Sequence, residues 1–520
     1  DVFGVDTYNI TSKYYTPLEK NTLSPSFSGL LLYNRLIWIS FASLILLAFY
    51  KRFSFSERRS KKIKLDTQEQ LIKTTIHELP TVNIKDETLF LHFKSFFKMN
   101  LTSIYKHVTF RILFVFIIIN LIAGFTVGYE YYGLKYYPVT YQMSDDISGA
   151  SGLFVIIMLV FFSGELVWRD RDCQINEVVD STPHLTLIPL FSKTLSLFSL
   201  SIIIHLFLIL VAIFYQLIMG YTQIDFFLYL KDYLYNYIPL WFATSASLVA
   251  IQVIVNHKYI GYMISILLLL VLPIILTIMD IGSNMLDFGA TPYMIYSDLN
   301  GFGPSNKGVF WFSVYWVLFS IFLLTLSGMI WNRGSYKTFK ERIRSINSNT
   351  SKNYSLIVIS TGILWFLVAA FVFYNTQILN SYKTSDEYEK LAVSYEEKYK
   401  KFKNLPFPKL IEAKYNIDIF PKEKKADVSA DLIVYNQYEI SIDSILLNVN
   451  KQWDLSFDFP NASIISKDDN HGVHFYKIDP PMSPGDTLTV KLKNKYETKG
   501  FSNGGETTSI VKNGSFLNNF

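Results

Sequence analysis

Eight apolar segments, each roughly 20 residues long, constrain the fold of this chain more than any other feature. A segment of that length crosses the hydrocarbon core of a bilayer as an α-helix, and a helix satisfies its own backbone polar groups there. The segments are 30–50, 109–127, 147–167, 195–218, 238–255, 260–279, 308–331 and 354–374. The sequence therefore predicts a mainly α polytopic membrane protein with about eight transmembrane helices.

The positions of Lys and Arg predict how these helices are oriented. Positive charge in short loops marks the cytoplasmic side, and basic runs at 51–64 and 332–345 directly follow the first and seventh segments. A basic run beside a span is typical of a membrane anchor rather than of a nucleic-acid surface, so no nucleic acid is expected as a partner. Segments 51–105, 169–193 and 332–353 are therefore predicted to be cytoplasmic, and residues 1–29 extracytoplasmic.

The chain after the eighth span is also predicted to be extracytoplasmic, and there the apolar pattern changes. Residues 375–405 are polar with helical spacing and predict a stalk. Alternating patterns then predict short strands separated by turn residues, which is typical of an all-β sandwich over 406–520. The expected strands are 413–420, 426–435, 444–450, 474–478 and 487–492. On the other side of the spans, 51–105 is expected to be a cytoplasmic linker with an interfacial helix over 89–107.

The segment 165–193 between the third and fourth spans is dense in Arg, Asp and Glu. Such a charged helix does not lie in lipid, so we expect a cytoplasmic helical tip that ends at Pro183, with Lys193 reaching the membrane surface. Two interpretations stand side by side: an ordinary amphipathic connector, or a coupling helix that takes force from a partner. The candidate coupling residues are Glu165, Trp168, Arg169, Arg171, Glu177 and Asp180. Trp168 is expected to set the depth of the helix at the interface, and Glu165, Arg169 and Arg171 to orient it through ion pairs.

Motifs for chemistry are missing from the sequence. It has neither a Walker A motif nor H-E-x-x-H, and the segment His77–Thr81 only begins like the latter. His471 and His474 lack a visible third ligand, and His205 in the fourth span lacks an evident acidic partner. The single cysteine, Cys173, excludes an internal disulfide and is expected to be a reduced thiol. We therefore predict no enzyme activity, no catalytic residue, no metal and no cofactor for this chain.

Several motifs resemble one family in their order and spacing. The charged tip contributes Glu165–Arg171, Glu177–Pro183 and Ser192-Lys193. Together with the other motifs it resembles bacterial type-2 ABC transporter permeases fused to an aminopeptidase N-like zinc metallopeptidase. The other motifs are Asp1–Gly4, Asn34–Trp38, Phe53–Phe55, Tyr415–Pro421, Asn436, Pro480–Asp486, Lys499–Phe501 and Lys512–Phe516.

The resemblance implies a domain plan. Segment 30–50 would be the last span of a preceding permease unit in the same polypeptide, 106–331 a six-span permease unit, and 332–353 a basic cytoplasmic linker. Segment 354–374 would tether 406–520, which is similar to the N-terminal domain of aminopeptidase N. The chain is interpreted as an internal fragment of a longer protein, with any zinc site in a domain beyond Phe520.

The resemblance also implies a function. The chain is expected to be the permease subunit of an ATP-driven exporter in the bacterial cytoplasmic membrane, with ATP bound by a separate ATP-binding cassette subunit. One alternative is a membrane anchor for an extracytoplasmic zinc aminopeptidase without transport, and a weaker one is an envelope scaffold. The tip favours the exporter, because an anchor needs neither eight spans nor an Arg- and Asp-rich helix. The sequence does not identify the transported substrate.

Overall fold

The computed structural model describes residues 16, 29–52, 86–128, 130–131, 134–182, 185–294, 296–331, 339–349, 351–380, 382–449, 453–505, 508–511, 513 and 515. The chain divides into two compact units, 1–81 and 82–520. In the first unit, α3 (Leu30–Arg52) is a candidate membrane span, as predicted. The predictions for most of 1–29, for the basic run after Arg52, for His77–Thr81 and for Pro183 fall outside the described residues.

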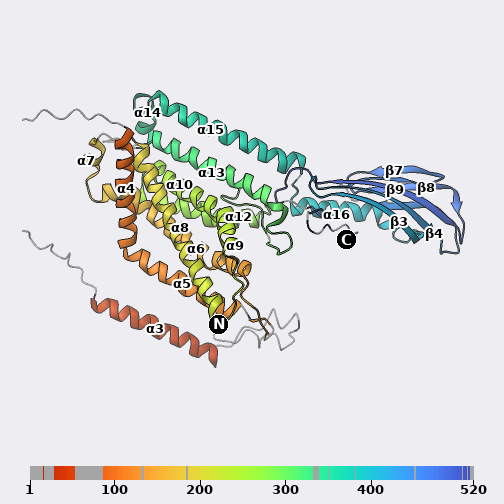
Figure 1. The fold of residues 1–520 in the computed structure, drawn as a ribbon, viewed down its shortest axis with the longest axis horizontal. Coiled ribbons are helices and arrows are strands. Elements are labelled where there is room, and N and C mark those ends of the chain that lie inside the picture. The colour runs from red at the N-terminus through yellow and green to blue at the C-terminus, as the bar shows by residue number, and fades with distance from the viewer. Residues whose placement is uncertain are drawn as a thin grey trace, which may run out of the picture. The chain divides into compact units, whose positions relative to one another are not determined.

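The second unit begins with a helical part (Figure 1). Its long helices are α4 (Asp86–Lys106), α5 (Val108–Gly128), α6 (Thr140–Asp172), α8 (Leu187–Ile218), α10 (Ile238–Val255), α13 (Asn306–Met329) and α15 (Lys352–Phe373). The shorter ones are α9 (Phe226–Asp232), α11 (Lys258–Ile266), α12 (Leu272–Ile278) and α14 (Phe339–Asn349). With α3, eight described helical segments are long and apolar enough to cross a membrane. This confirms the prediction of a mainly helical chain and fits a multi-pass membrane protein.

The helices differ in how much of their surface other helices cover. The span that contains α10 is 61% buried, whereas the span that contains α15 is 11% buried. α10 is rich in Ala and Ser, which let neighbouring helices approach closely, and the Ser247 hydroxyl lies 2.9 Å from that of Ser320 on α13. The core of the helical part is therefore formed around α6, α8 and α10.

Three spans begin earlier than the apolar pattern predicts. α6 starts at Thr140 rather than 147, α8 at Leu187 rather than 195, and α9 continues through a π-helical segment, Tyr233–Tyr237, into α10. In α6, Ser144 donates a hydrogen bond to the Asp232 carboxylate at 2.5 Å. Polar residues can lie in a span when other helices cover them, so hydropathy alone underestimates the length of the helix.

The C-terminal part of the second unit contains two antiparallel sheets. Their strands are β3 (Lys409–Phe420), β4 (Lys425–Tyr435), β5 (Ile442–Asn448), β6 (Trp453–Asp458), β7 (Ala462–Asp468), β8 (Val473–Met482) and β9 (Thr487–Glu497). The strand orders are β3-β4-β9-β6 and β5-β8-β7. Ile445 and Tyr476 of one sheet share a hydrophobic cluster with Leu432 and Val490 of the other. The predicted β region is confirmed, although β6 and β7 were not predicted.

A loop after β9 joins the β region to the helical part. Phe501 is 1% exposed and packs among Phe312 of α13, Phe371 and Val372 of α15. Asn503 adds polar contacts: its side-chain oxygen accepts from the Asn284 N–H at 2.9 Å, and its carbonyl accepts from the Asn284 side chain at 2.6 Å. The loop therefore holds the β region against the ends of two candidate spans.

We predict that Phe501→Ala destabilises this junction strongly. Truncation of a buried Phe costs about 3–5 kcal/mol, and the thermal unfolding midpoint of the purified protein in detergent should fall accordingly. Phe420→Ala is the matched control, because Phe420 is 40% exposed. Equal shifts for the two variants would contradict the role of Phe501.

Candidate functional site

The charged segment between the third and fourth spans forms two helices, not one. α6 continues to Asp172, and α7 (Asn176–Ser181) follows after a turn. Gln174 has φ +58° in that turn, the left-handed conformation that commonly ends a helix. The prediction of one continuous helix is therefore wrong. Among the candidate coupling residues, Glu165, Trp168, Arg169 and Arg171 lie on α6, and Glu177 and Asp180 lie on α7.

Lys258 binds the end of α6 to the start of α11. Its Nζ lies 2.8 Å from Glu165 Oε1 and 2.8 Å from Asp172 Oδ2. These two acids are seven residues apart and hence on one face of α6. Nearby, Tyr262 of α11 donates a hydrogen bond to the Phe161 carbonyl at 3.0 Å. Glu165 thus makes the kind of ion pair that was predicted, but with a partner far away in the sequence.

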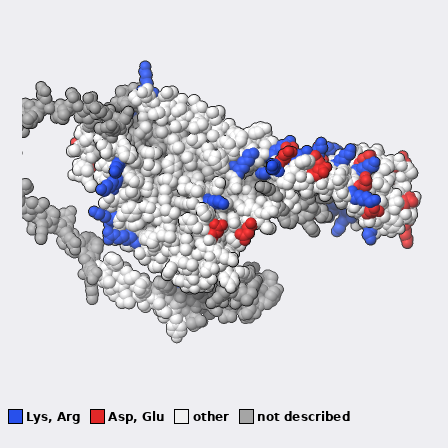
Figure 2. All heavy atoms as spheres, viewed as in Figure 1, with Lys and Arg blue, Asp and Glu red and all other residues white. Residues whose placement is uncertain are grey.

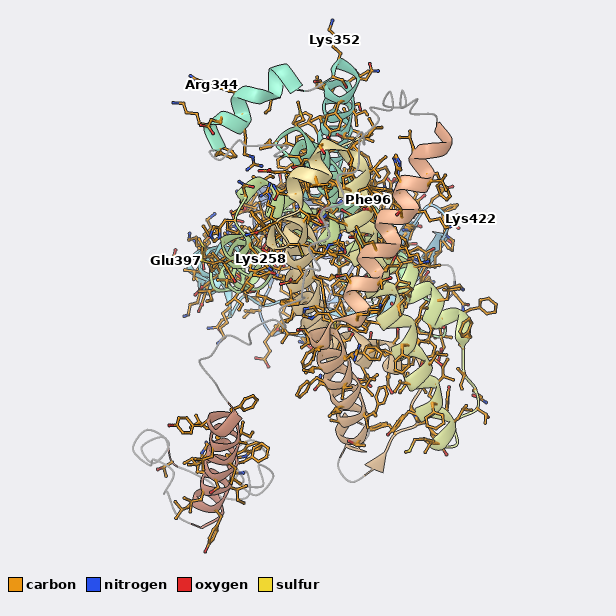
Figure 3. All side chains as sticks on the ribbon, turned by 90° about the vertical axis from the view of Figure 1, so that its left-hand side faces the viewer. Phe96, Lys258, Arg344, Lys352, Glu397 and Lys422 are labelled. Carbon is orange, nitrogen blue, oxygen red and sulfur yellow. The ribbon has the colours of Figure 1, made fainter. Side chains whose placement is uncertain are left out.

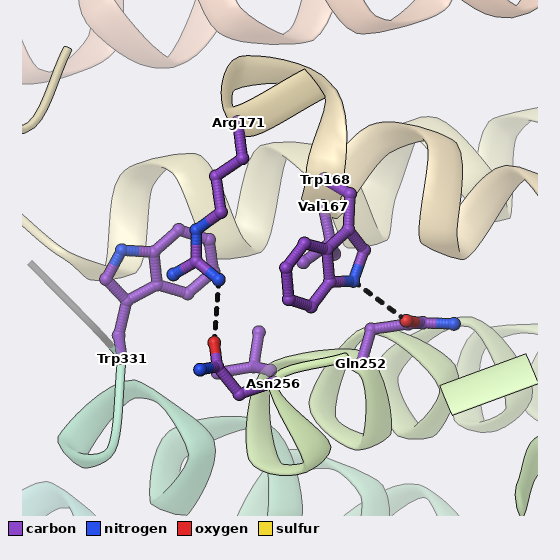
Figure 4. Close-up of a pocket in the computed structure, with 7 residues that line it drawn as sticks. Val167, Trp168, Arg171, Gln252, Asn256 and Trp331 are labelled. Atoms are coloured by element: carbon purple, nitrogen blue, oxygen red, sulfur yellow. Dashed lines mark hydrogen bonds between the residues drawn. The ribbon is translucent and has the colours of Figure 1, made fainter. Parts of the chain in front are cut away.

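Trp168 and Arg171 face α10 (Figure 4). The Trp168 indole donates to Gln252 Oε1 at 3.0 Å, and Arg171 Nη1 donates to Asn256 Oδ1 at 2.6 Å. The Arg171 guanidinium also lies 4.7 Å from the Trp168 ring centroid, within the range of a cation–π contact. With Val167, Val253 and Trp331 these side chains line a small pocket. Trp168 is therefore packed against α10, and its role in setting the depth of the helix at the interface stays a prediction.

Lys193 is buried inside the helical part instead of reaching the membrane surface. Its side chain donates to the Leu166 carbonyl at 2.7 Å and lies 3.7 Å from Asp170 Oδ2. Arg169 pairs with the same Asp170 at 3.5 Å. A buried ammonium requires acceptors, and these hold it between α6 and α8. The predicted snorkelling of Lys193 is therefore wrong.

Arg342 of α14 is a further part of this site that the sequence did not single out. It is 2% exposed and donates hydrogen bonds to three carbonyls: Ile330 at 2.9 and 2.6 Å, Val253 at 2.7 Å and Ile254 at 3.1 Å. These carbonyls lie at the C-terminal ends of α13 and α10, where intrahelical partners run out and a cation is favoured. Burial, and then the nearby Arg171, lower the pKa of Arg342 to about 10, so it stays protonated at neutral pH.

α7 shows the opposite arrangement, with apolar side chains turned outward. Val178 is 69% exposed, and Ile175 and Leu185 on either side of α7 are 47% and 52% exposed. The acidic Glu177 is exposed beside them, and Asp180 is half-buried. A group of exposed apolar side chains with polar neighbours is typical of a surface that contacts another protein or a membrane.

The end of α6 is thus fastened to three other helices: to α8 through Lys193, to α10 through Trp168 and Arg171, and to α11 through Lys258. Arg342 then ties the same end of α10 to α13. The end of α6 is therefore in direct side-chain contact with helices of three other candidate spans.

The β region also contains a Ser–His–Asp arrangement. His471 Nδ1 lies 2.9 Å from Asp468 Oδ2, and His471 Nε2 lies 2.6 Å from Ser394 Oγ on α16 (Ser385–Tyr399). The hydrogen bond with His471 has the largest effect on the pKa of Asp468, and the hydrogen bond that the Tyr399 hydroxyl donates has the next largest. Together they hold this pKa well below its usual range. The N–H groups of Asn470 and His471 donate to Asp468 Oδ1, so they are not available for an oxyanion. The group therefore fastens α16 to β7.

Two other histidines that the sequence singled out, His205 and His474, lie apart from this tip. His205 is buried with its ring 4.4 Å from that of Tyr233 and 4.6 Å from that of Tyr237, and His474 lies on β8. Among the residues that the structure describes, no three His, Cys, Asp or Glu side chains are grouped so that they could hold a metal ion.

Comparison with models of known protein families gives no match for this chain, and comparison with curated proteins gives none either.

We predict that Arg342→Met destabilises the helical part. It leaves buried carbonyls without their donor, at about 1–3 kcal/mol for an unsatisfied group, and the thermal unfolding midpoint in detergent should fall. Arg344→Met is the control on the same helix, because Arg344 is exposed and such a change usually stays within about 0.5 kcal/mol. If the two variants were equally stable, the bridging role of Arg342 would be refuted.

Proposed function

We propose that this chain is the permease subunit of an ATP-driven exporter, and that a separate ATP-binding cassette subunit acts on its tip. The observation that carries the proposal is the contrast within the tip: the end of α6 is bound to α10 and α11, whereas α7 leaves Val178 exposed. A coupling element needs one surface for the motor and one for the spans. The resemblance of the tip to type-2 ABC permeases points to the same partner.

The exporter proposal includes an orientation. The tip, α4 and α14 would be cytoplasmic, the membrane would be the bacterial cytoplasmic membrane, and the two sheets would form an extracytoplasmic β-sandwich. Lys and Arg predominate at the end of the helical part where α4, α7 and α14 lie, on the face seen in Figure 2. Positive charge at one end of a set of spans favours the cytoplasm there.

The alternative of a simple anchor for a peptidase explains less. An anchor needs hydrophobic spans, but it gives no reason to bury Lys193 and Arg342 among helix carbonyls at one end. An envelope scaffold would use the exposed side chains of α7 but not their connection to the spans. The β-sandwich would accompany the permease as the first part of a peptidase-like domain, with no catalytic role of its own.

The coupling prediction uses the exposed side chain of α7. Val178→Asp should weaken association with the ATP-binding subunit about tenfold or more, because a charge at the centre of an apolar contact costs more than about 1 kcal/mol. The measurement is the dissociation constant between the purified chain and the ATPase subunit. Val393→Asp on α16 is the control, with a 51% exposed side chain.

A second variant separates binding from transmission. Trp168→Phe removes the hydrogen bond to Gln252 and should preserve association while lowering substrate-stimulated ATP hydrolysis. The proposal would be refuted if Val178→Asp left association unchanged and Trp168→Phe left ATP hydrolysis unchanged. The tip would then be an ordinary connector.

The orientation predicts how Cys173 reacts in intact cells. Cys173 is exposed in the tip and is the only cysteine of the chain, so a membrane-permeant maleimide should label it and an impermeant one should not. In a Cys173→Ser background, Asp469→Cys in the β region should show the reverse, because the Asp469 side chain is 78% exposed. Labelling of Cys173 by the impermeant reagent would invert the proposed orientation.

A further inference from the structure

α14 lies in the segment that connects two candidate membrane spans, and the ends of these spans indicate where the membrane surface lies. It lies between α13, which ends at Met329, and α15, which begins at Lys352. Both are candidate spans, so the segment that joins them lies close to the level at which they leave the bilayer. Figure 3, which looks along the horizontal axis of Figure 1, shows α14 from its side. Its axis therefore runs across the direction of α13 and α15 rather than along it.

Arg342 fixes which face of α14 looks inward. Its guanidinium is held by the carbonyls of Ile330, Val253 and Ile254, so the helix cannot rotate freely about its axis. The side chains on its other faces thus have defined directions, and Arg344 points away from the helical part in Figure 3.

Two stripes lie side by side on the exposed surface of α14. Phe339 and Ile343 are one turn apart, 52% and 47% exposed, and form an apolar stripe. Lys340 and Arg344 are also one turn apart and exposed, and they lie about 100° further round the helix. An apolar stripe bordered by cations is the pattern of a helix that lies in the interface of a membrane.

We propose that α14 is a lipid-binding surface helix, with Phe339 and Ile343 among the acyl chains and Lys340 and Arg344 on the headgroups of anionic phospholipids. The basic stripe argues for anionic rather than zwitterionic lipid, because each Lys or Arg near an anionic leaflet favours binding about fivefold. The exposed Lys352 at the start of α15 adds a third cation at the same end of the spans (Figure 3).

This site is physically linked to the ends of two spans. The same helix that rests on lipid carries the Arg342 contacts to α10 and α13. A change in the depth of α14 therefore acts on those helix ends. The inference does not depend on the exporter proposal, since it concerns only α14 and lipid.

The test measures the depth of single positions on α14. The full chain carries Cys173→Ser, so that a nitroxide attaches only to an introduced cysteine. The cysteine is introduced by Ile343→Cys in one variant. In the control variant it is introduced by Glu341→Cys, on the opposite side of the helix. The protein is reconstituted in phosphatidylcholine vesicles with and without phosphatidylglycerol. Electron paramagnetic resonance then compares collisions of each label with oxygen, which concentrates in the bilayer, and with a water-soluble nickel chelate.

We expect the label at 343 to collide mainly with oxygen and the label at 341 mainly with nickel. Lys340→Gln with Arg344→Gln should lower the ratio of inserted to uninserted label at 343 in phosphatidylglycerol vesicles, by about 25-fold for two cations. Both cations are exposed, so folding should persist. Equal nickel access at 343 and 341 in both lipids would overturn the proposal. The proposal would also be overturned if the label at 343 became inaccessible to nickel only after an ATP-binding subunit is added. A protein, and not lipid, would then cover this face of α14.

Discussion

Backbone carbonyls at helix ends, paired with buried cations, hold together one end of the helical part. A helix leaves its last four carbonyls without internal partners, and a buried cation needs acceptors for its N–H groups. Arg342 solves both problems at once, because it donates to carbonyls at the ends of α10 and α13. Lys193 solves the second problem, because it donates to the Leu166 carbonyl of α6. The spans are thus fastened by groups whose removal leaves both sides unsatisfied, and not only by apolar packing.

That constraint explains the form of the tip. With the end of α6 held by Lys193 and Lys258, and with Trp168 and Arg171 on α10, little of α6 can move independently. The left-handed Gln174 separates this fixed part from α7. Among the described residues of the tip, α7 therefore lies outside these contacts, with Val178 exposed, while the end of α6 contacts the spans. Under the proposed function, this division of roles is what couples a motor to a permease.

The sequence predicted the spans well because their length and apolarity are local properties. It failed where polar residues are satisfied by distant ones. Ser144 meets Asp232 across 88 residues, which extends α6 beyond its apolar stretch. The partners of the tip are equally remote, since Trp168 and Gln252 are 84 residues apart. A single sequence contains no signal for such pairs, and so it marks the tip as a charged segment but does not give the contacts of its residues.

The sequence also failed to predict three other features of the structure. Gln174 is a residue that rarely adopts positive φ, so nothing in its identity marks the break between α6 and α7. Arg342 stands among similar basic residues in 332–345, and composition alone does not separate the buried guanidinium from the exposed Arg344. The strands β6 and β7 are short, and their apolar alternation is weak. Their pairing with β9 and β8, respectively, decides their structure.

One helix connects the two ends of the second unit. Near the start of α13, the Phe312 ring lies 6.2 Å from that of Phe501 in the β region, and after its end the Ile330 carbonyl accepts from Arg342. The 24 residues of α13 span about 36 Å at 1.5 Å per residue. A helix of this length, packed along α10 and α15, moves more readily as a rigid body than by bending. The contacts of Arg342 and of Phe501 therefore lie at opposite ends of one helix, and α13 links them without any contact between the tip and the β region.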